Sequence, residues 1–472
     1  MIRLIIEKEL REIIGSVRFA ITFGICSLLI LLSFYVGARN YQVSVAQHEA
    51  AKRENIRRME GLTDWFSVQE YRVFLPPQPL AALVTGVSND IGRTTEVRGR
   101  GELSSEDSRF NDDPIFAVFR FLDLDFIFQI VLSLFAILFA YDTISGEKER
   151  GTLRLSFANA LPKDKYILGK LIGSFLALAV PLLLPILVGC LLLPIMSVPM
   201  SSDEWLRLSL IIGCGLLYFG AFLAIAIFVS SRTQRTSSSF VMLLVVWIFA
   251  VLIIPRTSVL IAGRTVDVPS VDEIASQKNR FSSQLWEEDR KTMGTFKPTA
   301  SNSQPDKIMQ EFNSFMQNIG DEREKKMSEF SGRLNEERAN RQRIQERFAF
   351  GLARVSPAAS FSLAVTSLAG TSLSLKDHFR QEAVAYQQQY AKFMKEKTGA
   401  VTGGRMMVFK SETDNGQKPK PIDANEMPSF TYTPVGWKDV VGSALPDIGL
   451  LALFNIIFFA ASYFGFLRYD VR

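Results

Sequence analysis

Residues 167–196 read ILGKLIGSFLALAVPLLLPILVGCLLLPIM, an apolar run whose only charged residue, Lys170, lies near its beginning. About 20 apolar residues are enough to cross the roughly 30 Å hydrocarbon core of a bilayer as a helix. Similar apolar runs recur along the chain, and the charged residues collect between them. This segregation, rather than the average composition of 48% hydrophobic and 21% charged residues, predicts an integral membrane protein.

Six apolar runs are long enough to be predicted as transmembrane helices. We expect a membrane all-α fold with six transmembrane helices, an N-terminal interfacial helix, and an extracytoplasmic insertion of helical and α+β character. The predicted order is an interfacial helix at 1–16, span 1 at 17–38, an extracytoplasmic segment at 39–121, span 2 at 122–141, a cytoplasmic connection at 142–166, spans 3 to 5 at 167–255, a large, mostly helical extracytoplasmic domain at 256–446, span 6 at 447–467 and a cytoplasmic tail at 468–472.

The two long polar segments differ in the secondary structure that their residues predict. After span 1 the sequence has few helix breakers, so the helix is expected to continue outward. Between Phe66 and Arg100, turn residues and β-formers predict a small unit with strands. Residues 271–354 predict paired helices, because an apolar face around Phe312 and Ile319 is backed by mixed charges. These charged faces could bind a partner, but mixed charge also stabilises a helix that has none.

The short loops decide the predicted orientation. The loop from Ser197 to Leu206 has no Lys or Arg and contains two acidic residues. The connection at 142–166 is rich in basic residues, so the positive-inside rule places it and both termini in the cytoplasm. The basic residues of the connection are Lys148, Arg150, Arg154, Lys163 and Lys165.

The connection contains the most informative short motif, Tyr141-Asp-Thr-Ile-Ser-Gly-Glu-Lys-Glu-Arg-Gly-Thr-Leu-Arg-Leu155. Ser145 is suited to cap a helix with Glu147 and Glu149 in its first turn. Such a helix would present charges and either Leu153 or Leu155 to a partner. Charge counting alone fits a solvated loop equally well.

This motif resembles that of type-2 ABC exporter permeases, and the similarity extends over the membrane part of the chain. The long outer insertion and the Pro76-Pro77 segment are closest to the branch associated with multicopper-enzyme maturation. The residues that carry the resemblance are Tyr141-Asp142, Ser145 to Glu149, Gly151 to Leu153, Gly169-Lys170, Lys8-Glu9 before span 1, Pro357 ahead of the apolar stretch Phe361 to Gly370, and the C-terminal Phe466 to Arg472.

The resemblance implies a homodimeric permease in the bacterial inner membrane that rests on a separate cytoplasmic ABC ATPase. ATP and Mg would be bound by that ATPase, and this chain would carry no cofactor. No Gly-x-x-x-x-Gly-Lys-Ser/Thr stretch occurs here, which agrees with a motor on another chain. The residues expected at the ATPase-coupling interface are Asp142, Ser145, Gly146, Glu147, Lys148, Glu149, Arg150, Gly151, Thr152, Leu153 and Arg154.

Catalytic, metal and nucleic-acid functions find little support. No Ser-His-Asp set or His-Glu-x-x-His motif occurs, so we expect no enzyme activity. His48 and His378 are the only histidines and lie far apart, and the three cysteines lie in apolar runs, so no copper site is expected. The net charge of +5 is small, and basic residues stand beside acidic ones, which argues against nucleic-acid binding.

Four polar residues at membrane depth are functional candidates by default. Asp123, Asp125 and Gln129 lie at the outer start of span 2, and Asn455 lies inside span 6. For the two aspartates, a position at the interface within reach of water is the competing explanation. Asn455 is expected to tie helices together.

The sequence leaves two main functional hypotheses. The first is an exporter permease that moves or extracts a substrate on the outer side of the membrane. The alternative is a mechanotransmitting membrane scaffold, which relays ATPase motion to an extracytoplasmic protein partner without transport. A gated channel is less well supported, because no span carries a regular polar stripe that could line a pore.

Overall fold

The computed structural model describes residues 2–68, 70–88, 91–99, 103–106, 123–158, 162–297, 305–398 and 421–468. The tail predicted at 468–472 lies outside these residues except for Arg468. The chain divides into two compact units. The first comprises Met1–Gly99, Leu103–Val259 and Phe350–Arg472, and the second comprises Leu260–Ala349.

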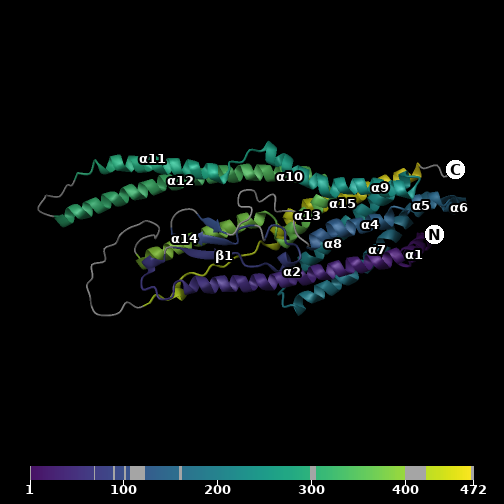
Figure 1. Ribbon diagram of the computed structural model, residues 1–472, viewed down its shortest axis with the longest axis horizontal. Helices are drawn as coiled ribbons and strands as arrows, with labels where there is room; N and C mark the ends of the chain where they lie inside the picture. Colours follow the sequence, from purple (N-terminus) through teal and green to yellow (C-terminus); the bar gives the residue numbers. More distant parts are fainter. Residues whose placement is uncertain are drawn as a thin grey trace. The chain divides into compact units, whose positions relative to one another are not determined.

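Long helices of the first unit coincide with the apolar runs of the sequence, and Figure 1 shows their arrangement. Ser16 begins the longest of them by accepting a hydrogen bond from the Phe19 backbone N–H at 3.1 Å. That helix, α2, extends to Arg57, so the helix of span 1 continues beyond the apolar run as predicted. A short helix, α1 (Ile2–Ile14), comes before the apolar runs. The helices that follow these runs are α2 (Val17–Arg57), α3 (Leu124–Phe126), the π-helical η4 (Ile127–Leu132), α4 (Ser133–Ala140), α7 (Lys163–Ile195), α8 (Ser202–Arg232), α9 (Thr236–Trp247), the π-helical η5 (Ile248–Ile253), α10 (Ile254–Thr265), α13 (Pro357–Ala369) and α15 (Trp437–Leu467).

Seven helical segments in the described part of the chain are long and apolar enough to cross a membrane, one more than predicted. The additional segment is Pro357–Thr398, made of α13 and the polar α14 (Ser374–Thr398). Its 13-residue apolar helix rises only about 20 Å, less than the thickness of a hydrocarbon core. Gly370, in a left-handed conformation with φ of 71°, ends α13 and separates it from α14. The apolar stretch by itself is therefore shorter than a predicted span.

The core of the first unit is built around α8, which packs against α4, α13 and α15 (Figure 1). Tyr218 and Phe222 of α8 are almost completely buried, and the Tyr218 ring stacks on Phe361 of α13 with centroids 4.8 Å apart. Trp247 donates a hydrogen bond to Ser133 at 2.7 Å, which joins α9 to the start of α4. Short side chains let the helices approach: a Cβ on Gly215 would lie 2.3 Å from the Phe128 ring.

A small antiparallel sheet follows α2, as the turn residues and β-formers between Phe66 and Arg100 predict. It contains β1 (Tyr71–Phe74), β2 (Thr94–Val97) and β3 (Ser104–Glu106), in the order β1-β2-β3. Tyr71 pairs with Val97, and its ring stacks on Tyr390 of α14 at 6.4 Å. The described residues also form three short 3-10 helices: η1 (Trp65–Ser67), η2 (Pro79–Ala82) and η6 (Ala424–Glu426).

The second unit is a pair of antiparallel helices, α11 (Val271–Met293) and α12, which spans Pro305–Ala353 (Figure 1). Phe281 stacks on Phe330 with centroids 4.1 Å apart. The Arg323 guanidinium lies 3.8 Å from the centre of the Trp286 ring. The paired helices predicted for this part of the sequence are therefore present, and aromatic contacts hold them together.

Candidate functional site

Two short helices follow α4 in the connection between the second and third predicted spans. They are α5 (Ser145–Glu149) and α6 (Thr152–Ala158), and Gly151 in the turn between them has a φ of 73°. This left-handed conformation costs little free energy for glycine. The local backbone therefore explains why the motif has a glycine at position 151.

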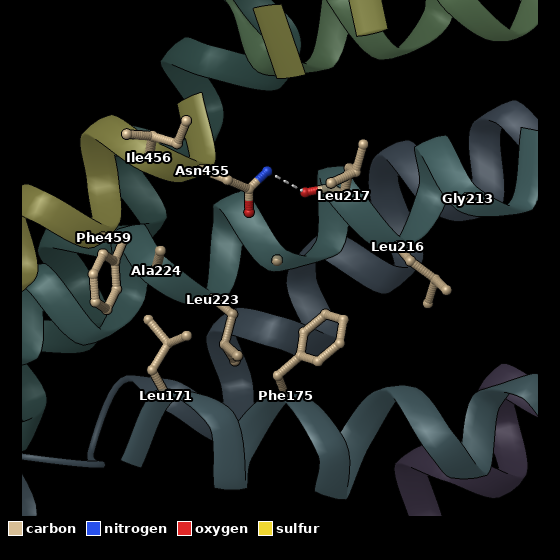
Figure 2. A pocket seen from close by; sticks show the side chains of 11 residues that line it. Leu171, Phe175, Gly213, Leu216, Leu217, Leu223, Ala224, Asn455, Ile456 and Phe459 are labelled. Carbon is tan, nitrogen blue, oxygen red and sulfur yellow. Dashed lines mark hydrogen bonds between the residues drawn. The ribbon is translucent and has the colours of Figure 1, made fainter. Parts of the chain in front are cut away.

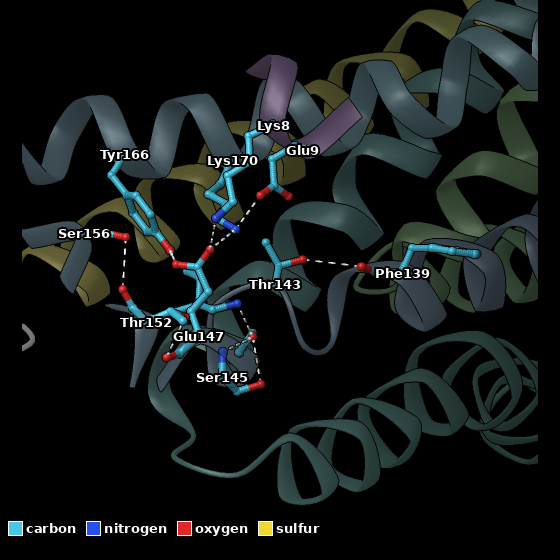
Figure 3. Close-up of polar contacts among 12 residues, drawn as sticks. Lys8, Glu9, Phe139, Thr143, Ser145, Glu147, Thr152, Ser156, Tyr166 and Lys170 are labelled. Atoms are coloured by element: carbon cyan, nitrogen blue, oxygen red, sulfur yellow. Dashed lines mark hydrogen bonds and ion pairs between the residues drawn. The ribbon is translucent and has the colours of Figure 1, made fainter. Parts of the chain in front are cut away.

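The centre of the site is the Glu147 carboxylate, which accepts hydrogen bonds from three side chains (Figure 3). Its Oε1 atom lies 2.8 Å from Lys170 Nζ and 3.0 Å from Lys8 Nζ, and its Oε2 atom accepts from the Tyr166 hydroxyl at 2.5 Å. Lys170 also donates to Glu9. The side chain of Lys170 is 3% exposed, so this ammonium is buried between two carboxylates.

These contacts join three separate parts of the chain. Lys8 and Glu9 belong to α1, Glu147 to α5, and Tyr166 and Lys170 to the first turns of α7. Burial raises the pKa of the Glu9 carboxyl above its ordinary value, although the Lys170 ammonium beside it acts in the opposite direction. A buried charge cluster of this kind is costly to break, because removing one member leaves another uncompensated.

A serine on another helix caps α5. The expectation that Ser145 caps it is wrong: Ser145 is the first residue of α5, and its hydroxyl donates to the Tyr141 carbonyl at 2.9 Å. Ser230 Oγ, near the end of α8, accepts hydrogen bonds from the backbone N–H groups of Ile144 at 3.1 Å and Ser145 at 2.9 Å. The cap therefore comes from a residue more than 80 positions away, and it fixes α5 to α8.

The last two residues of α5, Lys148 and Glu149, contact the turn between α8 and α9. Lys148 Nζ donates to the carbonyls of Ser231 and Thr233, the latter at 3.1 Å, at the C-terminal end of α8. Glu149 accepts from the Thr236 backbone N–H at 3.0 Å and from its hydroxyl at 2.8 Å, at the first turn of α9. Both charges match the helix dipoles that they meet.

Helix α1 packs closely on α7 at two glycines. A Cβ on Gly169 would lie 2.9 Å from Ile5 Cγ2, and a Cβ on Gly173 would lie 2.9 Å from Glu9 Cβ. Such distances are too short for ordinary packing, so larger residues would push α1 away. The Gly169-Lys170 pair of the motif therefore has two roles here: the glycine allows α1 to approach, and the lysine binds its carboxylate.

The predicted coupling residues separate into an anchored face and a free face. Leu153 is 2% exposed, whereas Leu155 is 70% exposed, so of the two leucines only Leu155 is available to a partner. Asp142 contacts Arg18 at 3.8 Å. Of the eleven predicted residues, Ser145, Gly146 and Leu153 are buried, Asp142, Glu147 and Lys148 are half-buried, and Glu149, Arg150, Gly151, Thr152 and Arg154 are exposed.

Three of the residues that hold α5 in place, Tyr166, Ser230 and Thr236, belong to no motif of the sequence. One signal was available: Glu9 lies on the same helical face as Ile6 and Ile13, so a carboxylate interrupts the apolar side of α1. Such a carboxylate needs a buried cation, which Lys170 supplies. Ser230 and Thr236 gave no comparable signal, because serine and threonine are common at helix ends.

The polar residues at the start of span 2 are buried, which argues against the expected contact with water. Asp123 is 8% exposed and accepts from the backbone N–H groups of Thr85 and Phe126. Asp125 accepts from the Ser362 hydroxyl at 2.6 Å. Gln129 donates to the Ala358 carbonyl at 3.3 Å. These residues fasten span 2 to the loop after η2 and to α13.

Asn455 ties two helices together, as predicted. Its side-chain amide on α15 donates to the Leu217 carbonyl of α8 at 2.8 Å (Figure 2). It also lines an otherwise apolar cavity of about 390 Å³ between α7, α8 and α15. Phe175 and Phe459 are among the other residues that line this cavity (Figure 2).

Metal ligands do not gather in the described part of the chain: no group there contains three His, Cys, Asp or Glu residues placed to hold an ion. His48 packs edge-on against Phe74 with ring centroids 6.2 Å apart. His378 forms a 2.7 Å hydrogen bond with the Thr433 carbonyl. The absence of a copper site stays a prediction.

Comparisons with known proteins agree with the membrane architecture. Residues 3–471 match the sequence profile of the family described as ABC-2 family transporter protein. Two curated relatives bear the name "Probable ABC transporter permease protein NosY": the protein of Pseudomonas aeruginosa is 35% identical over 126 residues, and that of Stutzerimonas stutzeri is 35% identical over 127 residues. Each alignment covers 26% of this chain and 45% of the relative, so the chain matches about half the length of these curated relatives.

Proposed function

The chain belongs to the ABC-2 family of transporter proteins and is a multi-pass permease subunit that is not itself an ATPase, and we propose that its partner ATPase binds the exposed face of α5 and α6. The permease acts as a homodimer in a bacterial inner membrane, with both termini in the cytoplasm. It moves or extracts a substrate on the outer side. ATP and Mg are bound by the ATPase.

The observation that carries this proposal is the division of α5 and α6 into an anchored face and a free face. Glu147, Lys148 and Glu149 bind α1, α7, α8 and the first turn of α9. A force applied to α5 is therefore transmitted to several membrane helices through hydrogen bonds rather than through a flexible loop. Such a connection is what a permease needs if the energy of ATP hydrolysis arises on another chain.

The free face has the chemistry of a protein-docking surface. Arg150 and Arg154 are exposed, and no described residue forms an ion pair with either. Leu155 adds an exposed apolar side chain next to them. Arginines around an apolar anchor are typical of protein interfaces. The proposed partner therefore presents a carboxylate-rich groove with an apolar floor to α6.

Co-purification with the ATPase encoded beside this chain tests the docking proposal. The amount of ATPase recovered is compared between the wild-type permease and permease variants in which a charge on α6 is reversed or an apolar residue becomes acidic. Arg154→Glu and Leu155→Asp should each reduce the amount of ATPase recovered about tenfold or more, because each disrupts the proposed contact. Arg264→Glu is the matched control, since this exposed arginine lies on α10 in the predicted outer domain. Equal recovery of the ATPase with all three variants would contradict docking on α6.

A mechanotransmitting scaffold is the second candidate, and the length of α2 favours it. This single helix of 41 residues is about 60 Å long, twice the thickness of a hydrocarbon core. A movement at its α1 end could reach the sheet, because Asn55 near the far end of α2 donates to the Arg72 carbonyl at 2.9 Å. In this function α2 acts on an extracytoplasmic protein partner and nothing crosses the membrane.

Reconstitution with the ATPase separates the two candidates. Flux of a substrate through proteoliposomes without an outer partner supports the exporter. ATP-dependent change in the distance between spin labels at Arg53 of α2 and Lys438 of α15, with no flux of any tested lipid or peptide, supports the scaffold. A second pair of labels, at Arg53 and Gly24, lies on the same helix and should keep its distance, so it serves as the control.

A further inference from the structure

A small polar cavity of about 50 Å³ lies beside α2, just beyond the apolar run of that helix. One wall comes from α2, and the other from the loop between β1 and β2 and the start of α14. No carboxylate lines it among the residues that the structure describes. The residues that line it are Asn40, Tyr41, Ser44, Leu75, Pro76, Pro77, Gln78, Ala81, Ala82, Thr85, Ser88, Arg93 and Leu375.

Arg93 is the charged residue of this cavity, and no described residue pairs with its guanidinium. The neighbouring arginines differ: Arg72 and Arg98 both form ion pairs with Glu96, at 3.1 and 3.5 Å. Arg93 is half-buried, and burial lowers the pKa of its guanidinium. A partly desolvated cation without a counter-ion is unfavourable, so an anion from outside the chain would stabilise it.

The wall formed by α2 adds hydrogen-bond donors, and a positive charge, Lys52, lies further along the same helix. Asn40, Ser44, His48 and Lys52 follow one another at four-residue intervals, so they share one face of the helix. The side chains of Asn40 and Ser44 form no hydrogen bond with other described residues. Lys52 and Arg93 both lie close enough to His48 to act on it electrostatically.

Acidic groups lie outside the cavity but near its edges. Glu49 acts electrostatically on His48, and Glu204 at the start of α8 acts on Tyr41. Neither of these carboxylates lines the cavity, and Arg93 is the charged residue among those that do.

The cavity lies at the level where the membrane helices end. Gln42, which lies between Asn40 and Ser44 in α2, donates to the Met196 carbonyl at 2.6 Å. Met196 is the residue that ends α7, and the next helix begins at Ser202. This turn belongs to the short loop that the charge pattern places outside. A phospholipid headgroup in the same leaflet would carry its phosphate at this depth.

We propose that Arg93, with Asn40 and Ser44, binds a single phosphate-sized oxyanion in this cavity. The guanidinium supplies the charge and paired N–H donors, and the amide and hydroxyl complete the hydrogen bonds. The volume suits one headgroup phosphate or one free phosphate ion, but no acyl chain. The site does not depend on which ATPase-coupled function the chain performs.

Two binding measurements on the full-length protein distinguish the sources of the anion. In the lipid arm, the protein is extracted from nanodiscs of phosphatidylcholine doped with phosphatidylglycerol, and bound lipid is counted by native mass spectrometry. In the free-anion arm, delipidated protein in neutral detergent is titrated with inorganic phosphate against chloride at equal ionic strength. Retained phosphatidylglycerol identifies a headgroup, and saturable phosphate binding without lipid identifies a free ion.

The same measurements on variants decide the proposal. Arg93→Gln should weaken binding about tenfold or more, and Ser44→Ala less strongly, because it keeps the guanidinium. Arg98→Gln is the matched control and should bind as the wild type does, since this exposed arginine is paired with Glu70 and Glu96. If Arg93→Gln does not fold, Asn40→Ala and Ser44→Ala together provide the comparison. Wild-type protein that binds neither probe, or folded variants that bind both unchanged, would overturn the proposal.

Discussion

The Nζ atom of Lys170 lies 2.8 Å from Oε1 of Glu147, although the two residues belong to α7 and to the short helix α5. The same ammonium contacts Glu9 of α1. One buried lysine thus connects the short helix that we propose as part of the docking site to the N-terminal helix and to the third predicted span. A movement of α5 that kept these contacts would have to move α1 and α7 as well.

Loss of this ammonium should destabilise the protein strongly. Lys170→Met leaves the buried Glu9 carboxylate without its cation, and Glu147 keeps Lys8 and the Tyr166 hydroxyl as its donors. Breaking a buried ion pair in this way should lower the free energy of unfolding by about 3–5 kcal/mol. Thermal unfolding of the purified protein in detergent, followed by circular dichroism, would measure the change.

The control for this prediction is the other lysine of the cluster. The Lys8 side chain is 56% exposed, so Lys8→Met should cost about 1 kcal/mol or less. The double variant Lys170→Met/Glu9→Gln should recover part of the stability, because it removes the carboxylate that was left unpaired. Equal effects of Lys8→Met and Lys170→Met would mean that burial does not distinguish the two cations.

Removal of the Ser230 hydroxyl should loosen α5 without unfolding the protein. In Ser230→Ala the N–H groups of Ile144 and Ser145 lose their acceptor, which should cost about 1–2 kcal/mol. Hydrogen exchange should then accelerate at these two amides. Ser209→Ala on the same helix is the control, since this exposed hydroxyl bonds only the Leu206 carbonyl among the described residues. Unchanged exchange at α5 in Ser230→Ala would show that the cap does not hold it.

The sequence was enough to predict the features that depend on local pattern. Apolar runs located α2, α7 and α8, because crossing a membrane requires long apolar helices. The run at Phe361 to Gly370 was harder to classify, since α13 is shorter than a span and becomes a membrane candidate only together with α14. Helix α13 is buried because it packs against α8 and α15. Its short length gives no indication of these neighbours.

The candidate site was predicted as a stretch of chain but not as a set of contacts. The motif predicted residues 142–154 as the site. However, Ser145 was predicted as the cap of α5, which is wrong, and Glu147 was expected to be a surface charge. Both errors have the same cause: the partners Ser230 and Lys170 lie on other helices, and spacing along the chain does not report such contacts. Only the carboxylate on the apolar face of α1, Glu9, indicated a buried partner in advance.

Close packing of α1 on α7 gives a third prediction. A Cβ at position 173 would lie 2.9 Å from Glu9 Cβ and 3.2 Å from the Ile6 backbone. Gly173→Ala should therefore displace α1, weaken the Glu9–Lys170 contact and cost about 1–3 kcal/mol. Gly213→Ala on α8 is the matched control, because a Cβ there meets no atom within 4 Å. Thermal unfolding of the two variants would show equal stability if α1 does not pack as described.

The ion pair between Arg354 and Asp447 gives the last prediction. Arg354 Nε lies 2.6 Å from Asp447 Oδ1, and its Nη2 lies 3.0 Å from Oδ2, so the pair is bidentate. Asp447 is 2% exposed in α15, and Arg354 lies between α12 and α13. Arg354→Met should cost about 2–3 kcal/mol, below the range for a fully buried pair, because the Arg354 side chain is 37% exposed. Arg354→Lys keeps the charge but loses the second hydrogen bond, so its thermal midpoint should fall between those of the wild type and Arg354→Met. If Arg354→Lys and Arg354→Met unfold at the same temperature, the bidentate geometry rather than the charge holds α13 against α15.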